Sequence, residues 1–349
     1  MLFRSTRFPT ARAVGYLLSH LRCCGPETIL KTQHGASPSL PLSIFHPPSS
    51  ILYAGCVRWK KITIVGMGLL GGSLGLVARK KRLAGEVAAY VRRPQSIKEC
   101  ERAGAADYAT TDLLAAVSNA DLVILCTPLA QMRELAGRML PALKRGAIVS
   151  DVGSVKGSVV AELEPIIAVA GAHFVGAHPM AGGERSGVGA ASVDLFRNAV
   201  CVLTPTANSD ASAVRALEDF WRALGSRLLT LTPELHDELV ARCSHLPHVV
   251  AAELVNYVLS PSHPKEQAQL CANGFRDTTR IAAGSPEMWR DIALANGAQL
   301  SQVLDAFIAD LQKLQRAIQG GEAKVVEEFF ATARQRREGW SGQASPSSE

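Results

Sequence analysis

The sequence predicts an α/β protein in which an N-terminal doubly wound parallel sheet is followed by an all-α C-terminal domain. From residue 61 to residue 153, short apolar runs alternate with amphipathic segments, and this order produces parallel strands joined by helices. After residue 233 the strand-like runs stop and only helical patterns continue. The chain has 349 residues, of which 47% are hydrophobic. This is enough for two domains that each bury a core.

The predicted elements follow one another regularly. Strand-like runs cover residues 62–66, 86–91, 120–128, 147–153, 172–177, 199–203 and 228–231. Helical patterns cover 69–82, 95–103, 132–140, 234–259, 274–283 and 287–318. Ligands of such sheets bind beyond the carboxyl ends of the strands, where Thr127 and the segment 151–156 fall. We expect an NAD(P)-binding domain over 61–233, a helical domain over 234–338 and a polar tail over 339–349.

The first 60 residues show no sustained periodicity and are poor in acidic residues. Their charged residues are Arg4, Arg7, Arg12, Arg22, Lys31, Arg58 and Lys60 against Glu27. Such a start is typical of an organelle transit peptide, but a wrongly chosen start codon gives the same pattern. We favour a bacterial, cytoplasmic chain without targeting, with an organelle as the alternative.

Composition argues against several classes of partner. After residue 60 the chain holds 30 basic and 30 acidic residues, which does not indicate a basic face for nucleic acid. No apolar run approaches the roughly 20 residues needed to cross a bilayer, so we expect no membrane span. The eight cysteines include no Cys-x-x-Cys pair, which predicts neither a zinc site nor a disulfide framework and favours a reducing compartment.

A glycine-rich loop joins the first predicted strand to the first predicted helix. Gly66, Gly68 and Gly71 have the spacing Gly-x-Gly-x-x-Gly, which is typical of Rossmann-type dinucleotide sites. The phosphates would bind free N–H groups at the start of the helix. The predicted cofactor-binding residues are Gly66, Met67, Gly68, Leu69, Leu70, Gly71, Arg92 and Thr127.

The end of the second predicted strand bears on the choice of cofactor. NAD sites usually have Asp or Glu there to hold the ribose 2′-hydroxyl, but this chain has Val91 or Arg92. Arg92 and Arg93 could pair with a 2′-phosphate, although two solvated surface arginines would look the same. We therefore expect NAD or NADP, with a lean to NADP.

The last long helical pattern carries a heptad repeat. Its apolar positions are Leu300, Leu304, Phe307, Leu311, Leu314 and Ile318. Such a seam packs either within one subunit or between two. We expect a homodimer through the helical domain.

Four further motifs suggest the chemistry: DVGSVK (151–156), GAHPMAGGERSG (176–187), SHLPH (244–248) and GFRDTTRIAAGSPEMWRDI (274–292). Together with the glycine loop, they resemble the prephenate/arogenate dehydrogenase family of tyrosine biosynthesis, from about residue 61 to about residue 318. The resemblance implies oxidative decarboxylation of prephenate to 4-hydroxyphenylpyruvate, or of arogenate to tyrosine, with reduction of NAD or NADP.

The resemblance also implies roles for individual residues. His178 matches the catalytic histidine, which takes the hydroxyl proton, and Ser154 matches the serine that orients it. Arg280 matches the arginine that binds a substrate carboxylate, and His248 matches a substrate-binding histidine. His245 belongs to the same motif and is expected to bind substrate, with a structural hydrogen bond as the alternative role. The His245/His248 pair has no third ligand nearby, so no metal is expected.

Some features leave alternatives open. Gly183 stands where some relatives carry a hydroxyl residue that touches substrate, so the choice between prephenate and arogenate stays open. We expect Arg276, Asp277 and Trp289 to line the pocket, either in their own subunit or in a neighbouring one. Other β-hydroxyacid-type dehydrogenases rely on a lysine in the helical domain, but no lysine occurs between Lys156 and Lys265. A catalytically silent dinucleotide sensor would not need His178, Ser154 and Arg280 together.

Overall fold

The computed structural model describes residues 59–183, 185–260, 262 and 264–340. Most of the extension expected over residues 1–60, and most of the tail expected over 339–349, lie outside these residues. Within the described part of the chain, no helix is both long and apolar enough to cross a membrane.

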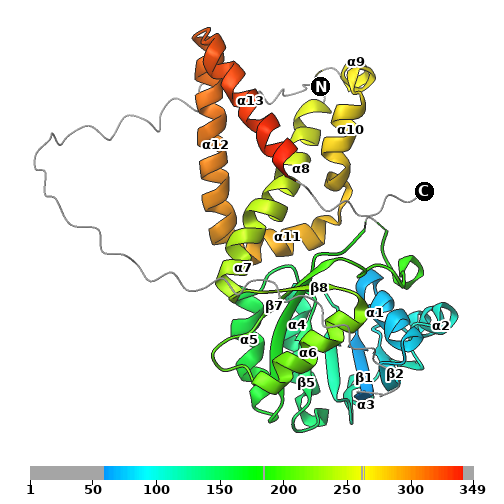
Figure 1. The fold of residues 1–349 in the computed structure, drawn as a ribbon. Helices are drawn as coiled ribbons and strands as arrows, with labels where there is room; N and C mark the ends of the chain where they lie inside the picture. The colour runs from blue at the N-terminus through cyan, green and yellow to red at the C-terminus, as the bar shows by residue number, and fades with distance from the viewer. Residues whose placement is uncertain (1–58, 184, 261, 263, 341–349) are drawn as a thin grey trace, which may run out of the picture. The chain divides into compact units, whose positions relative to one another are not determined.

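One eight-stranded sheet forms the centre of the first domain, with the strand order β3-β2-β1-β4-β5-β6-β7-β8 (Figure 1). The strands are β1 (Trp59–Val65), β2 (Ala84–Tyr90), β3 (Tyr108–Thr110), β4 (Leu122–Leu125), β5 (Ile148–Asp151), β6 (His173–Pro179), β7 (Val200–Thr204) and β8 (Arg227–Thr230). All neighbours from β3 to β6 are parallel. The predicted fold is therefore confirmed.

The last two strands of the sheet, β7 and β8, run opposite to the other six. Strand β7 runs antiparallel to β6, and β8 runs parallel to β7. The sequence predicted both strands as extensions of the sheet but not the reversal, because an apolar run of four or five residues carries no direction.

Helices cover both faces of this sheet. They are α1 (Leu69–Lys80), α2 (Pro94–Ala103), α3 (Leu113–Val117), α4 (Leu129–Met139), α5 (Gly157–Ala168) and α6 (Ala211–Leu224), with short 3₁₀ turns η1 (Leu140–Ala142) and η2 (Val188–Ala190). Successive strand residues point to opposite faces. Ile124 packs in the cluster that includes α1 and α6, whereas Val123 and Leu125 pack with α3, α4 and α5.

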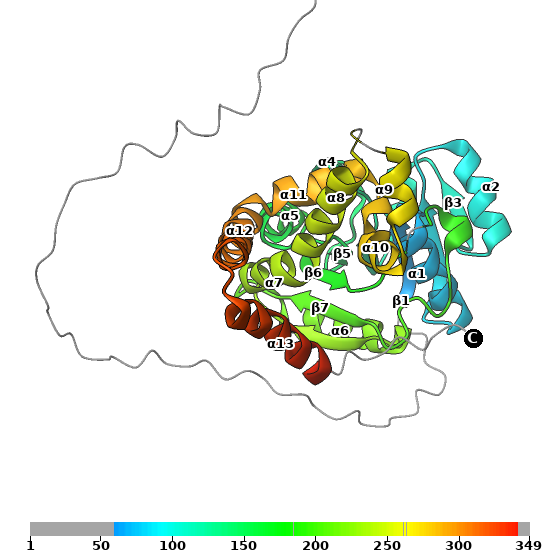
Figure 2. The same ribbon diagram turned by 90° about the horizontal axis from the view of Figure 1, so that it is seen from above.

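The second domain is helical and lies at the carboxyl end of the parallel strands (Figures 1 and 2). It contains α7 (Pro233–Val240), the π-helical turn η3 (Ala241–His245), α8 (Leu246–Val258), α9 (Pro264–Leu270), α10 (Asn273–Thr279), the 3₁₀ turn η4 (Arg280–Ala283), α11 (Pro286–Ala295), α12 (Gly297–Gln319) and α13 (Ala323–Gly339).

Two segments that the sequence predicted as continuous helices are interrupted. The π-helical turn η3 separates α7 from α8. Pro247, the second residue of α8, has no N–H and would crowd the preceding turn of a continuous α-helix. The second interruption is at Asn296, between α11 and α12. The two interruptions meet, since Asn296 Nδ2 is 3.2 Å from Nδ1 of His245, the last residue of η3.

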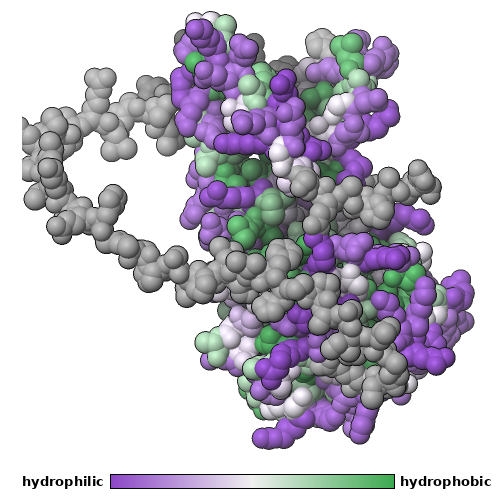
Figure 3. Space-filling model, viewed as in Figure 1, coloured by the Kyte–Doolittle hydropathy of each residue, from purple (hydrophilic) through white to green (hydrophobic). Residues whose placement is uncertain are grey.

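The heptad seam of α12 is only partly buried within one chain. Leu300 is 5% exposed, but Leu311 is 46% and Ile318 is 59% exposed. Figure 3 shows apolar side chains among the polar ones on the surface of the helical domain. The distal half of the seam thus retains apolar surface that a second subunit can cover.

Candidate active site

The glycine loop has the shape that a dinucleotide requires. Gly66 has φ of 100°, and a Cβ there would lie 2.8 Å from the backbone oxygen of Cys126. A Cβ on Gly71 would overlap the backbone oxygen of Gly66, so this glycine permits close packing of α1 on β1. A Cβ on Gly68 would meet no atom within 4 Å, so this position faces open space. Glycine is therefore required at residues 66 and 71 for different reasons, a positive φ and a close helix–strand contact, and at residue 68 it leaves space open.

Polar groups are available around this loop. Gly68 is the N-cap of α1, and Leu69, Leu70 and Gly71 form its first turn, whose N–H groups have no acceptor within the helix. The buried Oγ1 atom of Thr127 has no hydrogen-bond partner among the described residues. These groups fit the phosphates and hydroxyls of a dinucleotide.

The end of β2 bears two exposed cations. Val91 is buried, whereas Arg92 and Arg93 are exposed, and Arg93 is the N-cap of α2. No acidic side chain occupies the residues that directly follow β2, at 91–93. Both arginines are therefore accessible to solvent at the end of β2.

His178 lies at the carboxyl end of β6, 7% exposed. Its Nδ1 atom is 2.8 Å from Nε2 of His236, and the two rings meet edge to face. His236 is fully buried, and its Nδ1 atom is 2.8 Å from Oδ1 of Asp237. A chain of two imidazoles and a carboxylate therefore runs from β6 into α7.

The surroundings of His178 favour its neutral form. Burial lowers the pKa of His178 well below its ordinary value, and His236, Lys156 and His245 lower it further. At neutral pH the ring is therefore an unprotonated base.

A buried ion pair fixes the backbone next to this base. Lys156 and Asp151 are both fully buried and form an ion pair. Lys156 Nζ donates to the backbone oxygen of Ala177 at 2.9 Å, and the Ala177 N–H donates to Asp151 Oδ1 at 3.2 Å. The residue directly before His178 is thus held on both sides of its backbone.

Among the described residues, Ser154 makes no hydrogen bond to His178, although the resemblance implied one. The Nδ1 atom of His178 is instead bonded to His236. Ser154 lies beside His245, where its backbone raises the pKa of that histidine. Its role as the orienting serine stays a prediction.

The second half of the site connects to the first through Asn296. Its Nδ2 atom donates to the backbone oxygen of Asp237 at 2.8 Å and is 3.2 Å from Nδ1 of His245. His245 is 1% exposed, and its Nε2 atom has no hydrogen-bond partner among the described residues. Burial lowers the pKa of His245 to about 4, against the opposing attraction of Asp237.

His248 stacks on an aromatic ring and is affected by the charge of a nearby arginine. Its ring stacks on Trp289 with centroids 3.8 Å apart, and its Nδ1 atom is 2.9 Å from the backbone oxygen of Ser244. Burial lowers the pKa of His248, the bond to Ser244 opposes this, and the charge of Arg280 lowers it further. The effect of Arg280 places this arginine near His248, at the start of η4.

The loop after β6 reaches the glycine loop. A Cβ on Gly183 would lie 3.5 Å from Leu69 at the start of α1, and the Ser192 N–H donates to Ser73 Oγ at 2.9 Å. The segment that follows His178 therefore passes over the predicted dinucleotide site, and Gly183 is next to it.

Sequence reasoning missed His236, Asp237 and Asn296. His236 and Asp237 are both buried and adjacent in PELHDELV (233–240), and Val240 shares their buried face one turn later. A His-Asp pair on the apolar side of an amphipathic helix indicates buried polar groups, and the sequence could have shown it as a candidate for the site. Asn296 offered no such signal, because its partners come from distant parts of the chain.

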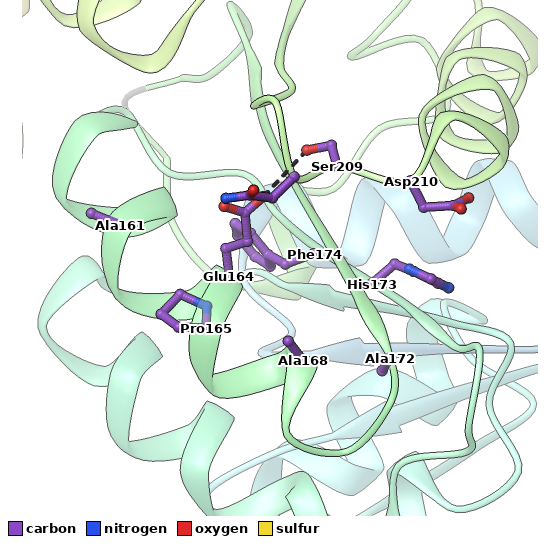
Figure 4. Close-up of a pocket in the computed structure, with 10 residues that line it drawn as sticks. Ala161, Glu164, Pro165, Ala168, Ala172, His173, Phe174, Ser209 and Asp210 are labelled. Carbon is purple, nitrogen blue, oxygen red and sulfur yellow. Dashed lines mark hydrogen bonds between the residues drawn. The ribbon is translucent and has the colours of Figure 1, made fainter.

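A cavity of about 470 Å³ lies elsewhere (Figure 4). It is lined by residues that include Glu164, His173 and Asp210. His173 begins β6, whereas His178 is near the end of that strand. The cavity therefore lies at the amino end of β6, away from His178, and is not part of this site.

Two protein-family models match the chain. The prephenate dehydrogenase nucleotide-binding domain matches residues 74–230, and the prephenate dehydrogenase dimerization domain matches residues 232–335. A cyclohexadienyl dehydrogenase of Zymomonas mobilis is 37% identical over 283 residues, which cover 80% of this chain and 95% of the relative.

Solved structures show the same similarity. Prephenate dehydrogenase from Aquifex aeolicus, in complex with hydroxyphenyl propionate and NAD+, matches with a TM-score of 0.74 and 34% identity, over 80% of this chain and 98% of the other. Arogenate dehydrogenase from Synechocystis matches with a TM-score of 0.70 and 30% identity, over 80% of this chain and 99% of the other.

Proposed function

Because this chain belongs to the prephenate dehydrogenase family, we propose that it oxidatively decarboxylates prephenate to 4-hydroxyphenylpyruvate while reducing NAD(P). The alternative substrate is arogenate, which would yield tyrosine. The observation that carries the proposal is a buried, neutral His178 at the carboxyl end of β6, joined to the glycine loop by the segment that follows it.

In this proposal His178 is the general base. The reaction removes a hydride from the carbon that bears the ring hydroxyl and a proton from the hydroxyl itself. A bound nicotinamide would accept the hydride. His178 takes the proton, which needs an unprotonated nitrogen at neutral pH, as its lowered pKa provides. Loss of the ring carboxylate as CO2 then leaves its electron pair to form the aromatic ring, and the phenolate oxygen takes a proton back.

The other histidines and Arg280 would bind the substrate. Both candidate substrates carry two carboxylates, so a buried site needs fixed cations or hydrogen-bond donors. Arg280 would hold one carboxylate, with His248 beside it. The partnerless Nε2 of His245 would hydrogen-bond to substrate. Ser154 would orient His178 once substrate is bound, since catalytic hydrogen bonds often tighten only in the complex.

The dinucleotide would bind along the glycine loop. Its pyrophosphate would lie on the amides of residues 66–71, including Met67, and Thr127 would hydrogen-bond to the ribose or nicotinamide side. Arg92, with Arg93 next to it, favours NADP over NAD because a guanidinium pairs with a 2′-phosphate.

We also propose that two chains pair through the helical domain. The exposed half of the α12 seam and the match to a dimerization domain support this. The domain limits would be 61–233 and 234–338, close to the gap between β8 and α7. The compartment would be the cytoplasm, with an organelle as the alternative if residues 1–60 are a transit peptide.

The test is the absorbance at 340 nm of purified protein with prephenate or arogenate, each combined with NAD or NADP. We expect reduction of at least one dinucleotide. The pair with the highest kcat/KM identifies substrate and cofactor. A folded protein that binds a dinucleotide but reduces neither with either substrate would contradict the proposal.

A further inference from the structure

We propose that His236 and Asp237 are positioning residues that fix the tautomer of His178, with the proton on Nδ1 and Nε2 free to take the substrate proton. The inference rests on the proposed function, since it concerns the base of the same reaction. It follows from the direction of each hydrogen bond in the chain of three side chains.

Asp237 is an acceptor at both oxygens. The backbone N–H of Lys156 donates to Oδ1 at 2.8 Å, and that of Gly157 donates to Oδ2 at 2.8 Å. A backbone N–H can only donate, and Gly157 begins α5, where the free N–H groups and the helix dipole favour an ionised carboxylate. The Nδ1 atom of His236, 2.8 Å from Oδ1, must therefore carry a hydrogen.

The donor in the hydrogen bond between His236 and His178 is determined in the same way. A neutral imidazole has one N–H, so a hydrogen on Nδ1 of His236 leaves its Nε2 as an acceptor. Nδ1 of His178 is 2.8 Å from that Nε2 and must donate to it. Nε2 of His178 is left without a hydrogen, as a general base requires.

Groups from every neighbouring element could affect this state. They are His236 and Asp237 on α7, His245 in η3, Lys156 before α5, Asp151 on β5 and Cys201 on β7. Of these, only His236 is within hydrogen-bond distance of the His178 ring in the described residues. Lys156 and Asp151 act on the neighbouring backbone instead.

The hydrogen-bonded relay from His178 through His236 to Asp237 connects the two domains. His178 belongs to the sheet, whereas His236 and Asp237 belong to the first helix of the helical domain. Asp237 can accept from the Lys156 and Gly157 amides only when α7 lies against the start of α5. Docking of the helical domain would therefore set the protonation pattern of the base as well as close the site.

The first measurement reads the tautomer without any activity. Protein labelled with ¹⁵N at its nine histidines is studied by two-bond proton–nitrogen correlation spectra, with His178→Asn used to assign His178. We expect wild-type His178 in the Nδ1–H form. A wild-type ring in the Nε2–H form would overturn the proposal.

Two substitutions at one position separate positioning from packing. His236→Gln can place an amide oxygen near the position of Nε2 and keep an acceptor for His178. His236→Asn places its amide near Nδ1 and leaves His178 without that acceptor. We expect His236→Asn to lower kcat about 10- to 1000-fold, within the ~10⁴-fold cost of a wrong tautomer in a Ser-His-Asp triad. KM and dinucleotide affinity stay near wild type, and His236→Gln recovers most of the kcat.

The control is His173→Gln, at the far end of β6, which leaves kcat unchanged. Equal losses of kcat in His236→Gln and His236→Asn, in step with equal losses of melting temperature, would overturn the relay. If the wild type reduces no dinucleotide with either substrate, the proposed function fails, while the spectra still decide the tautomer.

Discussion

Oδ2 of Asp237 accepts a 2.8 Å hydrogen bond from the backbone N–H of Gly157, so a side chain of the helical domain occupies the N-terminal end of a helix in the nucleotide-binding domain. A Cβ on Gly157 would lie 2.9 Å from that oxygen, which explains the glycine. Because His236 is bonded to the other oxygen of Asp237, one carboxylate links the contact between the domains to His178.

Replacing the base should abolish turnover with little effect on the dinucleotide. For His178→Asn we expect kcat to fall by a factor on the order of hundreds or more, because general-base catalysis is lost. Dissociation constants for NAD and NADP, measured by fluorescence titration, stay within about twofold. A parallel loss of dinucleotide binding would indicate misfolding and remove the support for a catalytic role.

Arg280→Gln should act on substrate binding. We expect a lower kcat/KM for the preferred substrate, mainly through a higher KM, since a carboxylate would lose its charged partner. The lost binding free energy should be about 2 to 4 kcal/mol. The control is Arg290→Gln, an exposed arginine on α11 paired with its neighbour Asp291. Steady-state kinetics that do not distinguish the two variants would exclude Arg280 from the site.

Gly68→Ala should weaken the cofactor without weakening the fold. A Cβ at Gly68 meets no protein atom, so the melting temperature should not fall. The methyl group would point into the space expected to hold the pyrophosphate, and we expect dinucleotide affinity to drop about tenfold or more. Gly137→Ala in α4, also with open space around its Cβ, is the control. Equal affinities in both variants would place the dinucleotide elsewhere.

Arg92→Gln should separate the two dinucleotides. If Arg92 pairs with the 2′-phosphate, kcat/KM for NADP falls about tenfold or more and that for NAD changes little. Lys98→Gln, at an exposed position on α2, controls for loss of one surface charge. Unchanged discrimination in Arg92→Gln would leave Arg92 and Arg93 as ordinary surface residues.

Buried histidines should make the fold sensitive to acid. The pKa of His245 is lowered to about 4, and an unfolded histidine titrates near 6.5, so between these values the unfolded chain binds more protons. The free energy of unfolding therefore keeps this contribution above about pH 6.5 and loses up to about 3 kcal/mol as the pH falls to 4. His178, whose pKa is also lowered, acts in the same direction.

Urea unfolding at pH 7.5 and pH 5 measures this effect. We expect a lower free energy of unfolding at pH 5 for the wild type and a smaller difference for His245→Gln. His173→Gln, with a half-buried histidine outside the site, serves as the control. A difference that His245→Gln leaves unchanged would show that His245 is not responsible.

The class of fold and most of the order of its elements could be read from the amino-acid sequence. Residue 66 needs a positive φ and residue 71 a close approach, and glycine at both positions makes these local demands visible in the chain. Strands such as β4 are apolar over their whole length because both faces of the sheet are covered. Elements of three to five residues, such as β3 and α3, were missed because they are too short to show a period. The longer helices α5, α6, α9 and α13 were also missed. Asp210 and Gly225 mark the ends of α6.

The contacts between distant side chains could not be read from the sequence and depend on the folded chain. The link from His178 through His236 to Asp237 joins residues 58 positions apart, and Asp237 in turn binds amides 80 and 81 positions away. The direction of β7 and the turns at η3 and Asn296 depend in the same way on packing between distant segments. Propensity and periodicity report local preferences, whereas a hydrogen bond between distant residues forms only after the chain has folded.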